Sequence, residues 1–362
     1  MRPLLVHIIV MIAIVGMAHA QGDSLHTWHV RANVHRGVVL PEYGSIDYLV
    51  NDFVHGAELS IVRQTRGKSI WEQLYKYPSF GLRLFYSGLG NAAVFGHQLA
   101  VSPYFVCRLV EAGPFSLDGE MGLGLSYATK TYDIRNNPRN ILIGSHLNIH
   151  YHAELMARLR FGRRFMWHAG IAFNHISNAN LAQPNVGINS GTLNTGFWYA
   201  LGKVQPVLRQ EIPEWKPRFV LEGRLSAGVK HTRTFESLKY AAAAVCVDGK
   251  YRWSHKFAAG IGGDFFYDAS VRPLMQRSGK DFLPQYAFMS GLHCTAEAYF
   301  GKASFALQHG FYLGLRPHLN SDWYYNRFVI NYHFTDHIFA SLSFKSRLVI
   351  LDYQELGLGF RL

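Results

Sequence analysis

The amino-acid sequence has little charge and very little cysteine. Asp, Glu, Lys and Arg together make up 17% of the 362 residues. The three cysteines, Cys107, Cys246 and Cys294, are an odd number without C-x-x-C spacing, which argues against a disulfide framework, so we interpret them as wall residues of strands. After residue 20 no segment approaches the roughly 20 consecutive apolar residues of a transmembrane helix. If the chain lives in a membrane, it must therefore cross as strands that close into a barrel.

The first 20 residues have the three parts of a secretory signal peptide. Residues 1–3 carry one arginine, residues 4–17 are almost entirely apolar, and residues 18–20 form a cleavage site of the A-x-A type. We therefore expect export of the chain and removal of residues 1–20. The formal net charge of +12 is compatible with contact to a phosphorylated lipid or to nucleic acid, or with a solvated positive lumen.

A long amphipathic strand is predicted at 147–160. Residues of odd number from Leu147 to Leu159 are apolar, whereas most residues of even number are polar. A strand of about 14 residues exceeds the common soluble length and suffices to cross a bilayer, with its apolar side to lipid and its polar side to a wet lumen. His150, His152 and Glu154 on the polar side could be metal ligands, but a polar lumen row explains them as well, and we expect no essential metal there.

Similar alternation recurs along the whole chain, with glycine and aromatic residues in abundance. Short turns and longer polar connections alternate, and an apolar final strand ends in Phe360 and Leu362, as in outer-membrane barrels. The fold class predicted is an all-β antiparallel transmembrane barrel of a Gram-negative outer membrane. The strands are expected at about 28–34, 57–66, 80–87, 96–108, 114–127, 147–160, 167–177, 189–201, 217–230, 239–252, 255–268, 285–299, 302–313, 325–334, 337–347 and 353–362.

A histidine, a serine and a carboxamide prolong the apolar face of one predicted hairpin. His175 and Ser177 continue the parity of the apolar residues between 167 and 173, and Asn189 has the parity of the apolar residues of the following strand. A serine hydroxyl becomes a good nucleophile when an imidazole accepts its proton and a third group fixes the imidazole tautomer. The hairpin could supply all three groups, although a lone His-x-Ser pair is more often ordinary polarity at a strand end.

Around this hairpin the sequence resembles the PagL-type lipid A 3-O-deacylases, outer-membrane barrel enzymes also called acyloxyacyl hydrolases. The resemblance implies that His175 is the general base, Ser177 the nucleophile and Asn189 the residue that orients the base. It implies oxyanion or substrate contacts for the loop residues of the same motif, with Asn185 as the expected oxyanion donor. The matching positions are His175, Ser177, Asn178, Ala179, Pro184, Asn185, Gly187 and Ile188, and the oxyanion or substrate residues implied are Asn178, Ala179, Asn180, Asn185 and Gly187.

Two positions depart from the family motif. Asn180 replaces a glycine, which changes the backbone conformation available to an amide in the oxyanion hole. Asn189 replaces a glutamate, and a neutral carboxamide can hold the imidazole tautomer but stabilises the imidazolium less. We therefore expect weaker chemistry, or a carboxylate such as Glu211 or Glu222 recruited from elsewhere.

The motif itself covers about 15 residues. The resemblance implies that residues 28–202 correspond to the family's eight-stranded barrel, with the catalytic hairpin as its last two strands, and no counterpart is evident for the additional strands of 203–362. No domain linker or sequence repeat is apparent. Because 16 strands are expected, we favour one enlarged closed barrel of 12 to 16 strands in 21–362 over two small barrels.

The resemblance implies a serine esterase that removes an ester-linked acyl chain from lipid A, with no cofactor and no nucleic-acid partner. Two alternatives stay open: a non-enzymatic pore or structural barrel with a decayed motif, and an outer-leaflet phospholipase. The acyl position and homodimer formation are also open. The shared parity of His175, Ser177 and Asn189 predicts a site on the lipid-facing wall near the extracellular rim.

Overall fold

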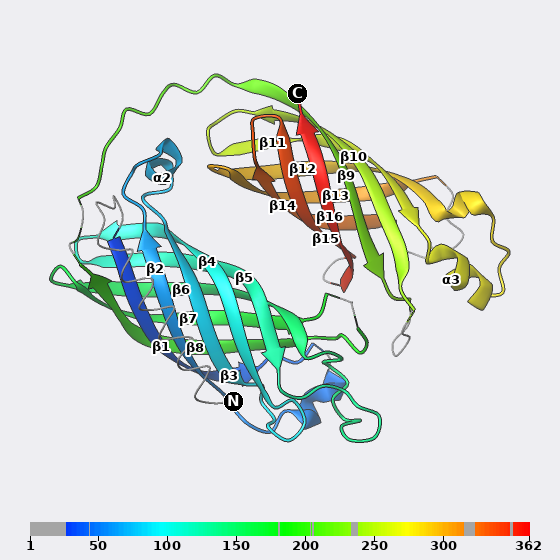
Figure 1. Cartoon of the computed structure of the whole chain (residues 1–362), viewed down its shortest axis with the longest axis horizontal. Helices are drawn as coiled ribbons and strands as arrows, with labels where there is room; N and C mark the ends of the chain where they lie inside the picture. Colours follow the sequence, from blue (N-terminus) through cyan, green and yellow to red (C-terminus); the bar gives the residue numbers. More distant parts are fainter. Residues whose placement is uncertain are drawn as a thin grey trace. The chain divides into compact units, whose positions relative to one another are not determined.

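The chain forms two separate closed barrels of antiparallel strands, coloured blue to green and yellow-green to red in Figure 1. The computed structural model describes residues 27–42, 44–179, 182–202, 204, 206–232, 238–314, 323–347 and 350–362. The predicted signal peptide at 1–20 lies outside these residues. The first barrel contains β1 (Thr27–Val39), β2 (Val54–Gln64), β3 (Ser79–Gly88), β4 (His97–Ala112), β5 (Phe115–Ala128), β6 (Leu147–Phe161), β7 (Phe165–Ser177) and β8 (Ile188–Leu201). The second contains β9 (Arg218–Lys230), β10 (Tyr240–Arg252), β11 (Phe257–Asp268), β12 (Phe288–Phe300), β13 (Ala303–Leu313), β14 (Tyr324–His333), β15 (Ile338–Arg347) and β16 (Ile350–Arg361).

The prediction of one enlarged barrel is wrong, although the number of strands and their faces are as expected. β8 pairs back onto β1, with Tyr199 opposite Val30, and β16 pairs onto β9, with Leu358 opposite Leu225. Each set of eight strands thereby satisfies its own edges. The described part of the connection, 206–217, contains no strand, so a linker that the sequence did not reveal joins the barrels.

Side chains fill the interior of the first barrel, so the expected wet lumen is wrong here. The Arg31 guanidinium binds Glu58 and donates to Glu120 at 2.5 and 2.9 Å, and Arg83 lies 2.9 Å from Glu58. These four side chains are 0% exposed. An eight-stranded barrel is just wide enough for its inward side chains to meet. The inward polar row therefore becomes a closed ion network.

The second barrel has an interior network of its own. Lys250 contacts Glu297 and lies 2.5 Å from Glu222, whose other oxygen accepts from Arg361 at 2.6 Å. Arg327 on β14 donates to Asp264 on β11 at 2.9 Å. Both barrels thus pair charged groups inside and direct apolar side chains outward.

The connections contain short helical segments that the sequence reading did not assign. The segment at 68–78, judged too irregular for a helix, contains the short helix α2 (Ile70–Leu74), and β1 extends five residues beyond its predicted end at 34. Further turns form η2 (Gly44–Leu49), α3 (Val271–Arg277) and η3 (Pro284–Ala287). Within the described residues, no helix has the length and apolarity needed to cross a membrane.

Candidate active site

The hairpin β7–β8 presents His175 and Asn189 directly opposite each other. In β7 the residues of even number from His168 to Ile176 are mostly buried in the interior, and those of odd number, including His175, are the more exposed ones. In β8 the same alternation directs Asn189 outward. The two residues are register partners, and the Asn189 carbonyl accepts from the Leu40 amide at 2.8 Å, which fixes its backbone against the end of β1.

The imidazole of His175 is held by the side chain of Asn189. Nδ1 of His175 lies 2.6 Å from Oδ1 of Asn189. Because a carboxamide oxygen only accepts, Nδ1 carries the proton in this pair. The other ring nitrogen, Nε2, is then the basic one, and it is the atom that could accept a proton from a nucleophile.

Ser177 is the last residue of β7 and lies two positions beyond His175. Residues i and i+2 of a strand project to the same side, about 6 to 7 Å apart between Cα atoms. The strand geometry therefore predicts that the side chain of Ser177 projects to the same outward side as the imidazole.

The loop after Ser177 is held by its asparagines. The Asn178 amide donates to Oδ1 of Asn185 at 2.7 Å, and the Ala182 amide donates to Oδ1 of Asn178 at 3.2 Å. Ala179 and Gly187 have φ values of +53° and +83°, the left-handed conformation that shapes the turn. The Asn178 amide is thus engaged by Asn185 in this structure. Asn180 lies outside the described residues.

One polar atom in this loop has no bonding partner among the described residues. Asn178 is 3% exposed, and its Nδ2 makes no hydrogen bond there. A buried donor left unpaired costs about 1–3 kcal/mol, so such a group suggests a role. It is a candidate oxyanion donor, in addition to the Nδ2 of Asn185.

The connection between β5 and β6 contacts the loop that follows Ser177. This contact was not predicted from the sequence. Ile143, 0% exposed, forms a bridge with Asn185. A Cβ atom added at Gly144 would lie 2.6 Å from the Gln183 carbon and the Pro184 oxygen, so the two backbones touch. The only signal of this contact in the sequence is Gly144 itself, and a single glycine does not indicate which distant segment packs against it.

The other residues considered from the sequence lie elsewhere. His150, His152 and Glu154 face the first barrel's interior, where His150 bonds Ser102 at 2.9 Å and His152 bonds Glu120 at 3.1 Å. Glu222 is buried inside the second barrel with Lys250 and Arg361, so its suggested recruitment to His175 is wrong. Glu211 is exposed on the connection between the barrels.

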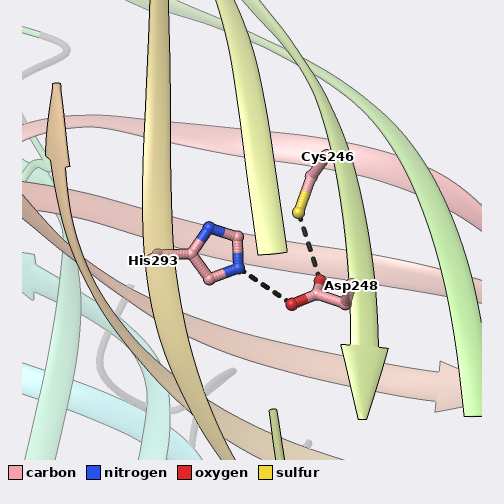
Figure 2. Close-up of side chains that lie close together, drawn as sticks. All are labelled: Cys246, Asp248 and His293. Atoms are coloured by element: carbon pink, nitrogen blue, oxygen red, sulfur yellow. Dashed lines mark hydrogen bonds and ion pairs between the residues drawn. The ribbon is translucent and has the colours of Figure 1, made fainter. Parts of the chain in front are cut away.

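One cluster among the described residues has a donor set that could hold a metal ion. Cys246, Asp248 and His293 meet inside the second barrel, with their ligand atoms within 4.8 Å of one another (Figure 2). His293 lies between two carboxylates, at 2.8 Å from Asp248 and 2.7 Å from Asp264, and the Cys246 thiol donates to Asp248 at 3.2 Å. Within the described residues, Cys107, Cys246 and Cys294 form no disulfide with one another.

The fold and the site define the class of protein. It is an outer-membrane protein of β-barrels, in which the outer wall of the first barrel carries a histidine held by a carboxamide. The family model "Lipid A 3-O-deacylase (PagL)" matches residues 55–198, and the model "Acyloxyacyl hydrolase, C-terminal domain" matches 218–362. Together the two matches span most of both barrels, and the chain belongs to the PagL lipid A deacylase family. The second half therefore has a counterpart, contrary to the expectation from sequence.

The chain is also similar, over about half of its length, to two solved structures. The outer membrane enzyme PagL is 22% identical, over 46% of this chain and 97% of that one, with a TM-score of 0.31. Neisserial surface protein A is 13% identical, over 48% of this chain and 96% of that one, with a TM-score of 0.32. No match was found among curated proteins.

Proposed function

We propose that this protein is a serine hydrolase of the outer membrane that removes an ester-linked acyl chain from lipid A. The main support is the 2.6 Å contact between His175 and Asn189 on the outward wall, two residues from Ser177. The chain's membership of the lipid A deacylase family agrees with this reaction.

The proposed reaction uses the three groups in sequence. Nε2 of His175 accepts the proton of Ser177, whose Oγ attacks the ester carbonyl. The imidazolium then protonates the departing sugar oxygen, and water releases the fatty acid from Ser177 by the same route in reverse. Asn189 holds the ring throughout, and the Nδ2 atoms of Asn178 and Asn185 are the candidate donors to the oxyanion.

The position of the site on the outward wall suits a lipid substrate. Lipid esters lie between headgroup and acyl chains, so a lipid could reach Ser177 laterally without leaving the leaflet. Entry into a polar interior would expose each CH₂ at a cost of about 0.8 kcal/mol. The filled first barrel offers no space for such entry around Arg31, Glu58 and Glu120.

The same filled interior disfavours the alternative of a pore. A conducting barrel needs an open lumen, whereas these central ion pairs are fully buried. Hydrolysis of an outer-leaflet phospholipid stays the second candidate function, because the chemistry of its acyl ester is the same and the site lies on the lipid-facing wall.

The proposal is tested by mass spectrometry of lipid A from cells that express the intact chain. The wild type should remove one acyl chain, and Ser177→Ala and His175→Ala should abolish that change while both barrels stay folded. Phospholipid extracts from the same cells separate the two substrates. Wild-type deacylation by Ser177→Ala, or an acyl pattern that is the same with and without the protein, would refute the proposal.

A further inference from the structure

The outward wall of the second barrel is polar on one side only. On β9, β10 and β11 the outward positions within the strands hold apolar residues, alanine or glycine. Polar groups facing lipid cost free energy because they lose water without gaining a partner. The outward polar residues of this barrel are instead collected on the remaining strands: Ser290, Cys294, His309, Asn326, Ser346 and Gln354.

Three of these residues form a row across neighbouring strands. Cys294 on β12 is the register partner of His309 on β13, and His309 is the partner of Asn326 on β14. Directly opposed residues have Cβ atoms about 4.5 to 5.5 Å apart. Cys294 and His309 are both exposed. A thiol, an imidazole and a carboxamide therefore lie side by side on the outer wall.

The imidazole of His309 is held in the same way as that of His175. Its Nδ1 lies 2.6 Å from Oδ1 of Asn326, the distance found between His175 and Asn189. The carboxamide oxygen again places the proton on Nδ1 and leaves Nε2 basic. Cys–His–Asn is a known catalytic combination, in which the histidine activates a thiol.

A groove at this row could accommodate an acyl chain. Its volume is about 690 Å³, within the range of small-molecule sites. Its lining includes Cys294, His309 and Asn326 together with the apolar side chains of Leu307, Phe328 and Phe344. His309 lies four residues before the end of β13 at Leu313, the end from which the longer connection to β14 leaves.

We propose that the second barrel carries its own acyl-ester hydrolase site, with Cys294 as nucleophile, His309 as base and Asn326 as the residue that positions the base. The substrate class is a long-chain acyl ester of a membrane lipid. This site acts independently of Ser177, so it goes beyond the function proposed above.

The reaction has two balanced steps. The thiol proton of Cys294 passes to Nε2 of His309 as Sγ bonds to the acyl carbon, and the ester C–O bond breaks. The departing alkoxide takes that proton and leaves as the alcohol. Water then attacks the thioester, His309 accepts its proton and returns it to the thiolate, and the fatty acid is released.

The test uses the full chain in vesicles of phosphatidylethanolamine and phosphatidylglycerol, with p-nitrophenyl palmitate as probe. In a Ser177→Ala background, palmitate release should continue, and adding Cys294→Ala should remove it. Adding His309→Ala should lower it about a hundredfold, the lower limit of general-base contributions. Cys107→Ala, which removes another strand cysteine, is the matched control and should change nothing.

Two further measurements separate chemistry from folding. Peptide mass spectrometry should find palmitate on Cys294, removable by neutral hydroxylamine as a thioester is. His309→Ala should slow alkylation of Cys294 by a lipid-soluble alkyl halide about tenfold but leave Cys107 unaffected. The proposal is overturned if Cys294 acquires no palmitate, or if Ser177→Ala/Cys294→Ala releases palmitate as fast as Ser177→Ala. Failure of the lipid A proposal would appear separately, as unchanged lipid A deacylation by Ser177→Ala.

Discussion

The 2.6 Å contact between Asn189 and His175 permits a quantitative prediction about the proposed chemistry. During attack by Ser177 the imidazole becomes a cation, so its hydrogen bond to Asn189 is charge-assisted. A hydrogen bond to a charged group contributes about 1.5–3 kcal/mol. Asn189→Ala should therefore lower kcat about 10- to 150-fold, at 1.4 kcal/mol for each factor of ten. Because Asn189 is only partly buried and faces outward, the barrel should fold normally.

Asn189→Asp gives the opposite expectation. The carboxylate is isosteric, so it can occupy the position of Oδ1 and stabilise the imidazolium by about 1 kcal/mol more, which corresponds to about a fivefold gain in kcat. The assay is steady-state deacylation of purified lipid A by protein in detergent, with circular dichroism as the check on folding. Thr195→Ala is the matched control, because Thr195 is an outward polar residue of β8 that bonds Trp167 at 2.9 Å. Wild-type kcat in Asn189→Ala would refute the orienting role.

Three other predictions concern the scaffold around the sites. Arg31→Met leaves the buried Glu120 without its arginine and Glu58 with Arg83 alone, and it should cost about 3–5 kcal/mol of unfolding free energy in urea titrations, whereas the exposed Arg36→Met should cost under about 0.5. Equal unfolding midpoints would contradict the importance of the network. Gly144→Val forces the loop of Gln183 and Pro184 away, and it should reduce deacylation without changing the melting temperature of the barrel. Gly223→Ala is the control, because a Cβ atom added at Gly223 meets no other atom. Unchanged activity of Gly144→Val would show that the contact between Gly144 and this loop is dispensable. His293→Ala leaves Asp248 and Asp264 facing each other, and it should lower the unfolding free energy of the second barrel by about 3–5 kcal/mol. An unchanged unfolding midpoint would contradict this role of His293. Separately, a rise in the wild-type melting temperature on addition of Zn²⁺ would identify the cluster as a metal site.

The strands and their faces could be predicted from the sequence because both are local properties. Alternation with a period of two placed the strand at 147–160 within one residue of β6, and it assigned His150 and His152 inward and His175 outward. The same local signal was too weak for short segments such as α2, which has only five residues. The alternation also predicted, from the sequence alone, that His175 and Asn189 lie on the outward face of their hairpin.

Closure of the barrels was decided by tertiary structure alone. Nothing in the alternation of β8 says whether it pairs with β1 or continues to β9, since both choices bury the same faces and differ only in which distant edge is satisfied. The contact between Asn189 and His175 likewise depends on register, because a shift of one residue would turn Asn189 inward. The row of Cys294, His309 and Asn326 shows this most clearly, since three residues spread over separate strands share no motif in sequence. The sequence by itself determined which side of the wall each residue faces, and the pairing of strands determined which residues meet, because register is a property of two segments and not of one.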